Sequence, residues 1–226
     1  MKKILVVAAH PDDEILGVGG TVLKHSLNGD ECFALILGEG MTSRYDKREL
    51  ANSIKVEKLH EDTYKAAEII GYKKIHMENL PDNRFDSIPL LDVVKIIEKY
   101  IEYIKPDIIY THFGGDLNID HKITFEAVLT ASRPMGQEYV KEIYAFETVS
   151  STEWNFNGID SFKPNYFVDI TETLDMKLKA MECYKSELKE FPHPRSNENL
   201  KASAIKWGSV VSKMYVEAFQ VMRIIK

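Results

Sequence analysis

One histidine and three acidic residues stand together near the start of the chain, directly after an apolar run. His10 ends this run, and Pro11 fixes the turn that follows it. The carboxyl groups of Asp12, Asp13 and Glu14 then crowd the start of an expected helix. An aspartate at that place can cap a helix, but capping needs only one aspartate and does not account for the histidine. The cluster therefore favours a functional loop.

A second candidate pair, Asp120 and His121, follows another apolar run in the middle of the chain. Taken alone, such a pair is more often a helix cap beside a surface histidine. Combined with His10 and Asp13, it makes a set of two histidines and one carboxylate. That set suits catalytic zinc, which takes three protein ligands and leaves a fourth position for water. It is equally the ligand set of non-haem iron(II) sites, so these residues leave the identity of the metal open.

Asp12, which directly precedes Asp13, favours hydrolysis over oxygen chemistry. One of two adjacent carboxylates can bind a metal while the other faces the bound water. Zinc lowers the pKa of that water to about 7, and a neighbouring carboxylate can then remove its proton during attack. An oxygenase needs no such base.

A third cluster, at residues 190–196, places His193 between two prolines. The prolines hold the histidine in a constrained, extended loop between two expected helices. Such a loop could bring His193 into a site, and it is equally consistent with an ordinary turn. The glycine-rich residues 17–20 contain no G-x-G-x-x-G motif, which favours close packing of a helix over dinucleotide binding.

The apolar pattern along the chain alternates short strand-like runs with longer helical ones. We expect strands at residues 4–9, 32–37, 74–77, 107–112, 142–147 and 166–168. We expect helices at residues 14–27, about 46–70, 90–104, 123–132 and 171–188, and a last helix capped by Ser196. The first strands are continuous apolar runs, which is typical of parallel strands buried on both faces. The predicted fold class is therefore α/β, a mostly parallel sheet with helices on both faces.

Ligands of open α/β sheets bind beyond the carboxyl ends of the strands. Polar side chains follow the second, third and fourth expected strands, among them Arg44, Asp82, Arg84 and Asn118. Together with the first cluster, four successive loops at one edge of the sheet carry side chains suited to a site. Surface loops are polar in any case, so this convergence supports the motifs but does not replace them.

The composition predicts one globular domain and excludes several classes of partner. The chain has 226 residues, of which 44% are hydrophobic and 28% charged, with a net charge of −6. Single α/β domains reach this length and no linker is visible, so we expect one domain over residues 1–226. The acidic charge and the short apolar runs predict binding neither to nucleic acid nor to a membrane. Two cysteines make no disulfide framework, so the expected location is the cytoplasm.

The string at residues 9–14, together with Asp120 and His121, resembles the PIG-L/LmbE-like superfamily of metal-dependent N-deacetylases. The string matches the first motif of that family in full, and the Asp-His pair matches the end of its second motif. The resemblance implies an LmbE-like, Rossmann-like fold over most of the chain. It also implies substrates that carry an N-acetyl group, usually on glucosamine-like sugars.

The resemblance assigns roles to individual residues. It implies a Zn²⁺ site, with another divalent metal such as Fe²⁺ as the alternative, formed by His10, Asp13 and His121. It implies that Asp12 is the general base. It suggests substrate contacts at Arg44 and Asp82, and Arg84 stands in a segment that is similar to bacterial sugar-modifying members.

The chain departs from the family at one position. Many members have a histidine three residues before the ligand histidine, where it stabilises the oxyanion or protonates the leaving amine. Asn118 stands at that position here. An asparagine can donate a hydrogen bond to an oxyanion but cannot deliver a proton. The acid role then passes to His193, to His112 or back to a protonated Asp12.

These observations predict a zinc-dependent hydrolase that removes the acetyl group from an N-acetylated amino sugar or its conjugate. The expected partner is a small N-acetylated sugar. Association of the chain with copies of itself, as a homo-oligomer, is a second expectation. One alternative is a deacylase or deformylase that acts on another small amide in a nucleotide-sugar or secondary-metabolite pathway, with Arg44 and Arg84 gripping a diphosphate. Two further alternatives remain. One is a metal-free module that binds a sugar or a nucleotide, and the other is an iron(II) oxygenase.

Overall fold

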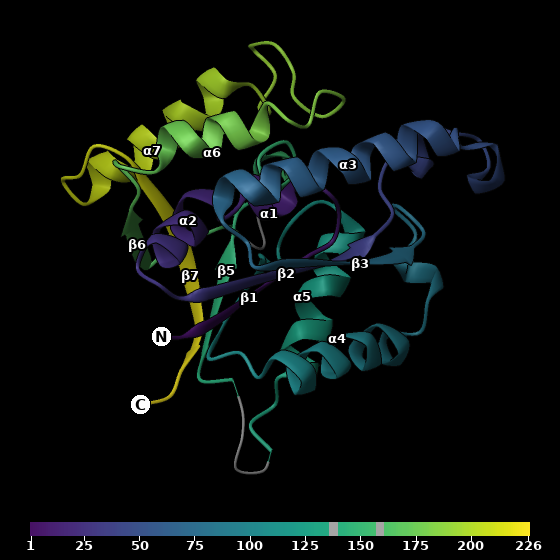
Figure 1. Cartoon of the computed structure of the whole chain (residues 1–226), viewed down its shortest axis with the longest axis horizontal. Coiled ribbons are helices and arrows are strands. Elements are labelled where there is room, and N and C mark those ends of the chain that lie inside the picture. Colours follow the sequence, from purple (N-terminus) through teal and green to yellow (C-terminus); the bar gives the residue numbers. More distant parts are fainter. Residues whose placement is uncertain (136–139, 157–160) are drawn as a thin grey trace.

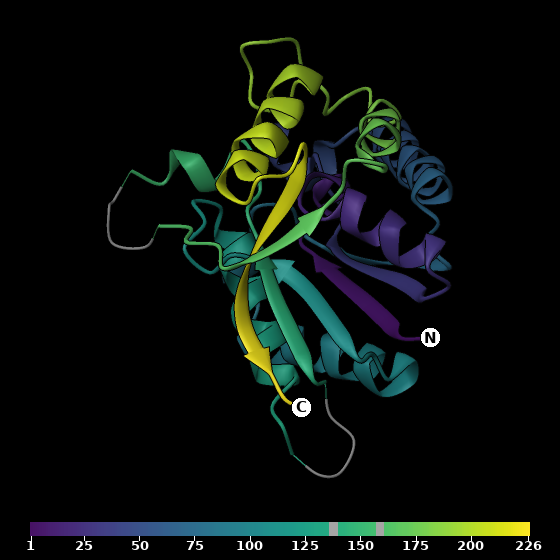
Figure 2. The ribbon, with the colours of Figure 1, turned by 90° about the vertical axis from the view of Figure 1, so that its left-hand side faces the viewer.

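A seven-stranded sheet with the order β3-β2-β1-β4-β5-β7-β6 forms the centre of the computed structural model, which describes residues 1–135, 140–156 and 161–226. The strands are β1 (Lys3–Ala8), β2 (Glu31–Gly38), β3 (Lys74–Leu80), β4 (Ile108–His112), β5 (Glu142–Phe146), β6 (Tyr166–Asp169) and β7 (Val216–Ile224). The strands β1 to β5 pair in parallel, whereas β7 is antiparallel to both of its neighbours. Figure 2 shows β7, in yellow, running opposite to β5. The mostly parallel α/β sheet that the sequence predicts is therefore confirmed.

Helices cover both faces of this sheet (Figure 1). They are α1 (Asp13–Leu16), α2 (Gly19–Leu27), α3 (Ser53–Ile70), α4 (Leu90–Ile104), α5 (Ile119–Ala131), α6 (Leu174–Met181) and α7 (Asn197–Val210). The pair α4 and α5 lies on one face, and the other five helices lie on the opposite face. Successive residues of β1 belong alternately to the two apolar clusters, Ile4 and Val6 to one, Leu5 and Val7 to the other. This burial on both faces explains the continuous apolar run of the strand.

The helix expected over residues 14–27 is broken into α1 and α2 at Gly17 and Val18. A Cβ atom on Gly17 would lie 2.2 Å from the ring of Phe146 at the end of β5. The chain therefore passes close to the sheet at this point. The sequence predicts the tight packing of this glycine-rich segment but not the break.

One strand of the structure is not expected from the sequence, and the bounds of two further helices differ from those expected. No strand is expected at β7, because Glu217 and Arg223 interrupt its apolar pattern. Glu217 is nevertheless buried, since the Nζ atom of Lys177 in α6 lies 2.6 Å from its Oε1 atom. The helix α6 is shorter than the expected 171–188, and α3 begins later than the expected residue 46.

The start of α5 matters most for the site. The helix begins at Ile119 rather than at residue 123, because the Asn118 side chain caps it and accepts the N–H group of Asp120 at 2.8 Å. Asp120 and His121 consequently lie in its first turn. Since β1 and β4 are neighbours in the sheet, this turn lies beside the loop that follows β1.

No helix among the described residues is long and apolar enough to cross a membrane. The cytoplasmic location, the single domain over residues 1–226 and the homo-oligomer stay predictions from the sequence.

Candidate metal centre and active site

Three donor atoms converge where β1 and β4 end. His10 follows β1, Asp13 opens α1, and His121 lies in the first turn of α5. The Asp13 Oδ2 atom lies 3.4 Å from both His10 Nδ1 and His121 Nε2, and these two nitrogens are 3.3 Å apart. The corners of a tetrahedron with ligand bonds of about 2.0–2.1 Å are about 3.3–3.4 Å apart. The three atoms therefore have the mutual spacing of three zinc ligands.

The surroundings of these atoms favour a positive charge among them. Burial opposes protonation of His121, but Asp13 and Asp116 outweigh it and raise the pKa of the imidazole to about 9. Burial also opposes ionisation of Asp13, but the histidines around it hold its pKa well below the usual value. The carboxylates that favour a protonated imidazole also favour a divalent cation, which binds to the neutral form of each imidazole. The donor set therefore fits a metal ion.

An acidic side chain orients the first imidazole. His10 Nε2 donates a hydrogen bond to Asp120 Oδ2 at 2.9 Å. Asp120 is itself fixed, because it accepts the backbone N–H groups of Asn83 and Phe85 at 2.6 and 2.9 Å. Partners of this kind fix the tautomer and orientation of a ligand histidine. The Nδ1 atom of His10 is thereby left to face the donor triangle.

The second imidazole has a similar setting. His121 Nδ1 lies 3.2 Å from Asp116 Oδ1, and Asp116 accepts the hydroxyl hydrogens of Ser151 and Thr152. The ring of His121 also stacks on the ring of His112, with centroids 3.9 Å apart. These contacts aim His121 Nε2 at the donor triangle.

His112 itself is a poor candidate for the proton donor. Its Nε2 atom accepts the backbone N–H group of Ala9 at 2.9 Å, so this nitrogen carries no proton. Its Nδ1 atom lies 3.1 Å from the hydroxyl of Thr148. Burial, followed by the charge of His121, lowers the pKa of His112 to about 3. The His112 ring is therefore neutral and fully buried, and it has a packing role.

Asp12 lies beside the donor triangle in an unusual backbone conformation. Its φ angle is 101°, a region that residues other than glycine rarely adopt. Glu14 Oε2 accepts the backbone N–H group of Asp12 at 3.0 Å, and Arg195 Nη1 donates to its Oδ2 atom at 3.0 Å. Burial raises the pKa of Asp12 well above its usual value, although Arg195 counteracts this effect. The carboxyl group is thus held in place and has a raised affinity for a proton.

Two adjoining pockets open onto this centre. The inner pocket has a volume of about 90 Å³ and is lined by residues that include His10, Asp12, Asp82 and Asn118. The outer pocket has a volume of about 430 Å³ and is lined by Ser150, Trp154, Lys189 and His193, among others. Arg44, Glu187 and Arg195 line both pockets, so a ligand with two parts can occupy them together.

The predicted substrate contacts fall at different places. Asp82 is buried in the wall of the inner pocket, with its Oδ1 atom 3.2 Å from His10 Nε2. Arg44 lies where the two pockets meet and donates to Glu187 at 2.5 Å. Arg84 is exposed and lines neither pocket, so the structure does not bring it to the others.

The two predicted oxyanion donors also differ in position. Asn118 lines the inner pocket, and its Nδ2 atom donates to Asn83 Oδ1 at 2.9 Å. His193 lines only the outer pocket, where its ring meets that of Trp154 edge-on, with centroids 6.0 Å apart. The Nδ1 atom of His193 accepts the N–H group of Arg195 at 3.1 Å.

Three residues of the centre are absent from the set predicted from the sequence: Asp116, Glu187 and Arg195. Arg195 stands two positions after His193, so the proline-constrained loop is the signal that points to it. Glu187 falls in a stretch that the pattern predicts as helix, and Asp116 falls in a glycine-rich turn. Nothing in their sequence context separates these two from ordinary surface acids.

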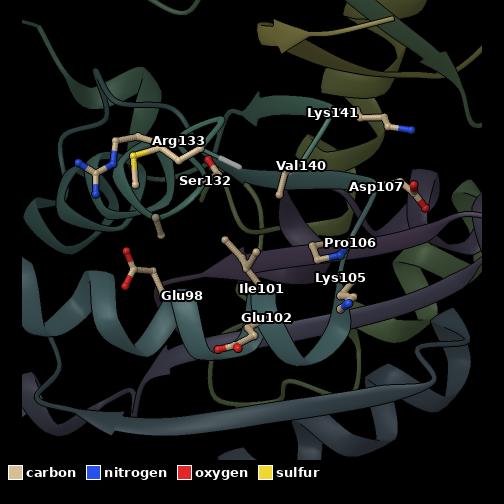
Figure 3. A pocket seen from close by; sticks show the side chains of 12 residues that line it. Glu98, Ile101, Glu102, Lys105, Pro106, Asp107, Ser132, Arg133, Val140 and Lys141 are labelled. Carbon is tan, nitrogen blue, oxygen red and sulfur yellow. The ribbon is translucent and has the colours of Figure 1, made fainter. Parts of the chain in front are cut away.

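A larger pocket, of about 710 Å³, lies at the opposite edge of the sheet (Figure 3). Its walls come from α4, from the segment before β4 and from the end of α5. They carry acidic and basic side chains, including Glu98, Glu102 and Arg133. Among the described residues, two groups could hold a metal ion: His10 with Asp13 and His121, and His10 with Asp82 and Asp120. Neither includes a residue of this larger pocket, so its chemistry does not resemble that of the carboxyl edge.

Sequence comparison gives two findings. The sequence model of the GlcNAc-PI de-N-acetylase family, PIG-L, matches residues 5–132, which is more than half of the chain. Diacetylchitobiose deacetylase from Thermococcus kodakarensis is 27% identical over 227 residues, which cover 97% of this chain and 83% of that protein.

Solved structures share the fold. The N,N'-diacetylchitobiose deacetylase of Pyrococcus horikoshii superimposes with a TM-score of 0.77 at 24% identity, covering 98% of this chain and 84% of that one. The 4-carboxy-2-hydroxymuconate hydratase of Pseudomonas putida KT2440 superimposes with a TM-score of 0.75 at 22% identity, covering 100% and 99%. Since one neighbour is a deacetylase and the other a hydratase, the reaction has to be argued from the site.

Proposed function

Because the chain belongs to the PIG-L family of GlcNAc-PI de-N-acetylases, we propose that it is a zinc-dependent hydrolase of N-acetylated amino sugars or their conjugates. The reaction removes the acetyl group as acetate and leaves a free amine. One observation carries this proposal. The triangle of His10, Asp13 and His121 donors has zinc-ligand spacing, and Asp12 lines the inner pocket together with His10.

The residues that would hold the metal ion are His10, Asp13 and His121. Two imidazole nitrogens and one carboxylate oxygen match a catalytic zinc site, which leaves a fourth position for water or substrate. The ion, when bound, acidifies water and polarises a carbonyl oxygen.

Asp12 is the proton carrier of the proposed mechanism. Arg195 donates a hydrogen bond to its Oδ2 atom. Among the described residues, none donates a hydrogen bond to its Oδ1 atom. Oδ1 is therefore the atom that takes a proton from a water molecule in the inner pocket as the acetamide carbonyl is attacked. The same carboxyl group then delivers the proton to the departing amine. Burial of Asp12 favours the first step, because it stabilises the protonated form and so makes the carboxylate a stronger base.

Asn118 donates a hydrogen bond that stabilises the negative charge developing on the carbonyl oxygen. One hydrogen of its amide group is used by Asn83, and the second is available at the wall of the inner pocket. A donor that is already positioned costs no reorganisation during the reaction. We assign Asn118 the role of orienting and stabilising this oxygen.

The substrate class follows from the family, from the relatives and from the pockets. Two of the similar proteins, from Thermococcus kodakarensis and Pyrococcus horikoshii, are deacetylases of diacetylchitobiose. The inner pocket is small enough to take an acetamido group, and the outer pocket offers Trp154, whose flat ring suits a sugar face. Asp82 and Arg44 are the proposed contacts to sugar hydroxyl groups. Arg84 lies outside both pockets, so a paired grip on a diphosphate has no geometric support.

Acetate release tests this function. Purified protein is incubated with N-acetylglucosamine, diacetylchitobiose, an acetylated glucosaminyl conjugate and the N-formyl analogue of each. We expect acetate from at least one N-acetyl sugar, loss of activity after chelation and its return with zinc. Formate release without acetate release would favour the deformylase alternative. Activity that survives complete metal removal would contradict the proposal.

A further inference from the structure

The Arg195 guanidinium group joins two parts of the centre that are far apart in the sequence. Its Nη1 atom donates to Asp12 Oδ2 at 3.0 Å and to Glu187 Oε2 at 2.9 Å. Its Nε atom donates to the hydroxyl of Ser150 at 2.7 Å. Three contacts on one side chain fix the plane and the position of the guanidinium group.

The surroundings of Arg195 show that this position is built into the fold. The carboxyl side chains of Asp12 and Glu187 are 2% and 5% exposed, so both contacts are made away from bulk water. The loop that carries Arg195 is itself held at both ends, since the backbone carbonyl of Arg195 accepts the N–H group of Lys189 and that of Pro194 accepts the Asn199 side chain in α7. Charge-assisted hydrogen bonds in such surroundings are strong and directional.

The charges around Asp12 explain why a cation is needed there. Asp13 and Glu14 follow it in the sequence, and Glu187 shares the Nη1 atom of Arg195 with it. Three carboxylates would push the Asp12 side chain away from them in the absence of a counter-charge. Arg195 supplies this charge and contacts Oδ2 alone, which leaves Oδ1 available to a partner in the inner pocket that Asp12 lines.

We propose that Arg195 is a positioning residue for the general base, which fixes the Asp12 carboxyl group in the one orientation that points its second oxygen at the reacting water. The proposal rests on the function proposed above. Glu187 is the anchor of this arrangement, because it also accepts a hydrogen bond from Arg44 at the meeting point of the two pockets. Arg195 acts through Asp12 and needs no contact with the substrate.

The test separates positioning from substrate binding and from folding. Arg195→Ala is compared with wild type and with Arg133→Ala, which removes an exposed arginine from the opposite edge of the sheet. Misplacement of a reacting group by about 1 Å costs on the order of 100-fold in rate, so kcat should fall by about that factor while KM changes less than about threefold. Metal content and the far-UV circular dichroism spectrum should stay at the wild-type level.

Added guanidinium chloride provides the decisive readout. The deleted side chain borders both pockets, so a free guanidinium ion can enter its place beside Asp12. We expect about 50 mM guanidinium to restore Arg195→Ala activity at least tenfold and to leave wild type and Arg133→Ala unchanged. Sodium chloride at equal ionic strength should restore nothing.

Several outcomes would overturn the inference. These are wild-type kcat in Arg195→Ala, a rise in KM alone, or a loss of kcat that guanidinium does not restore. If Arg195→Ala fails to fold, Arg195→Lys replaces it. A lysine cannot make the three contacts, so a kcat lowered at least tenfold supports the inference and a wild-type kcat contradicts it. Wild-type protein that releases no acetate from any N-acetyl sugar instead refutes the proposed function, and this inference with it.

Discussion

The Nε2 atom of His121 lies 3.3 Å from the Nδ1 atom of His10, although 111 positions of sequence separate the two residues. Their proximity follows from the sheet, since β1 and β4 are parallel neighbours and both residues follow the ends of these strands. A rigid sheet can hold such a pair without flexible loops. The proposed metal site therefore depends on the packing of the sheet as much as on the ligands.

Metal content tests the contribution of His121. We expect one metal ion per chain in wild type and a substoichiometric amount in His121→Ala, because only two protein ligands remain. Elemental analysis of purified protein measures this directly. His25→Ala is the matched control, since His25 pairs with Asp30 and contacts Tyr110 away from the donor triangle. Full occupancy in His121→Ala would exclude this residue as a ligand.

Asp120 should matter for metal affinity although it is not one of the three ligands. Asp120→Asn keeps the size of the side chain but weakens the acceptor that orients His10. Loss of such a partner typically costs about 10–100-fold in metal affinity, and we expect an increase in Kd of that size. Competition with a fluorescent chelator measures it. Asp92→Asn changes an exposed aspartate in the first turn of α4 and should leave Kd as in wild type. An unchanged Kd in Asp120→Asn would show that His10 is oriented without it.

His193 distinguishes two possible proton donors. It lines the outer pocket, so His193→Ala should raise KM while kcat changes less than about threefold. Loss of a general acid would instead lower kcat by about 100-fold or more. Steady-state kinetics on the best N-acetyl sugar decides between these results. A large fall in kcat at unchanged KM would move the acid role from Asp12 to His193.

The buried pair of Lys177 and Glu217 should matter for stability. The Lys177 Nζ atom also donates to the backbone carbonyl of Leu16, so it joins α6 to the end of α1 and to β7. Lys177→Met leaves Glu217 buried without a cation, which should cost about 3–5 kcal/mol of unfolding free energy. Urea denaturation followed by circular dichroism measures the change.

The control for this variant is Lys213→Met, which breaks an exposed ion pair with Asp169. A surface pair of this kind contributes about 0–1 kcal/mol, so its loss should barely shift the urea midpoint. Equal effects of the two substitutions would contradict the structural role of the buried pair.

The sequence predicts the sheet best where burial on both faces leaves a continuous apolar run, as in β1, β2 and β4. It does not predict β7, because Glu217 interrupts the apolar pattern and is buried through partners from other elements, the Lys177 side chain and the backbone N–H groups of Gly20 and Thr21. The break between α1 and α2 likewise depends on Phe146, which lies far along the chain from Gly17. Contacts of this kind are tertiary, and no local pattern encodes them.

The same division holds for the site. The first cluster and the Asp-His pair predict a metal site, because few structural roles require those residue types together. Glu187 has an ordinary local context, and its contact with Arg195 forms only in the folded chain. The proline-constrained loop points to Arg195, but the contact of Arg195 with Asp12 is likewise tertiary. Arg84 shows the opposite case, in which a suitable residue type in a suitable loop is exposed and lines neither pocket of the site.

Asp12→Asn, compared with wild type for acetate release and metal content, tests the central claim most directly. An asparagine keeps the shape of the side chain but cannot take up a proton from water. The variant should bind as much metal as wild type and unfold at the same temperature, while kcat falls by about 10²–10⁴-fold. Turnover near the wild-type rate in a fully metal-loaded variant would contradict the assignment of Asp12 as the base and the hydrolytic mechanism built on it.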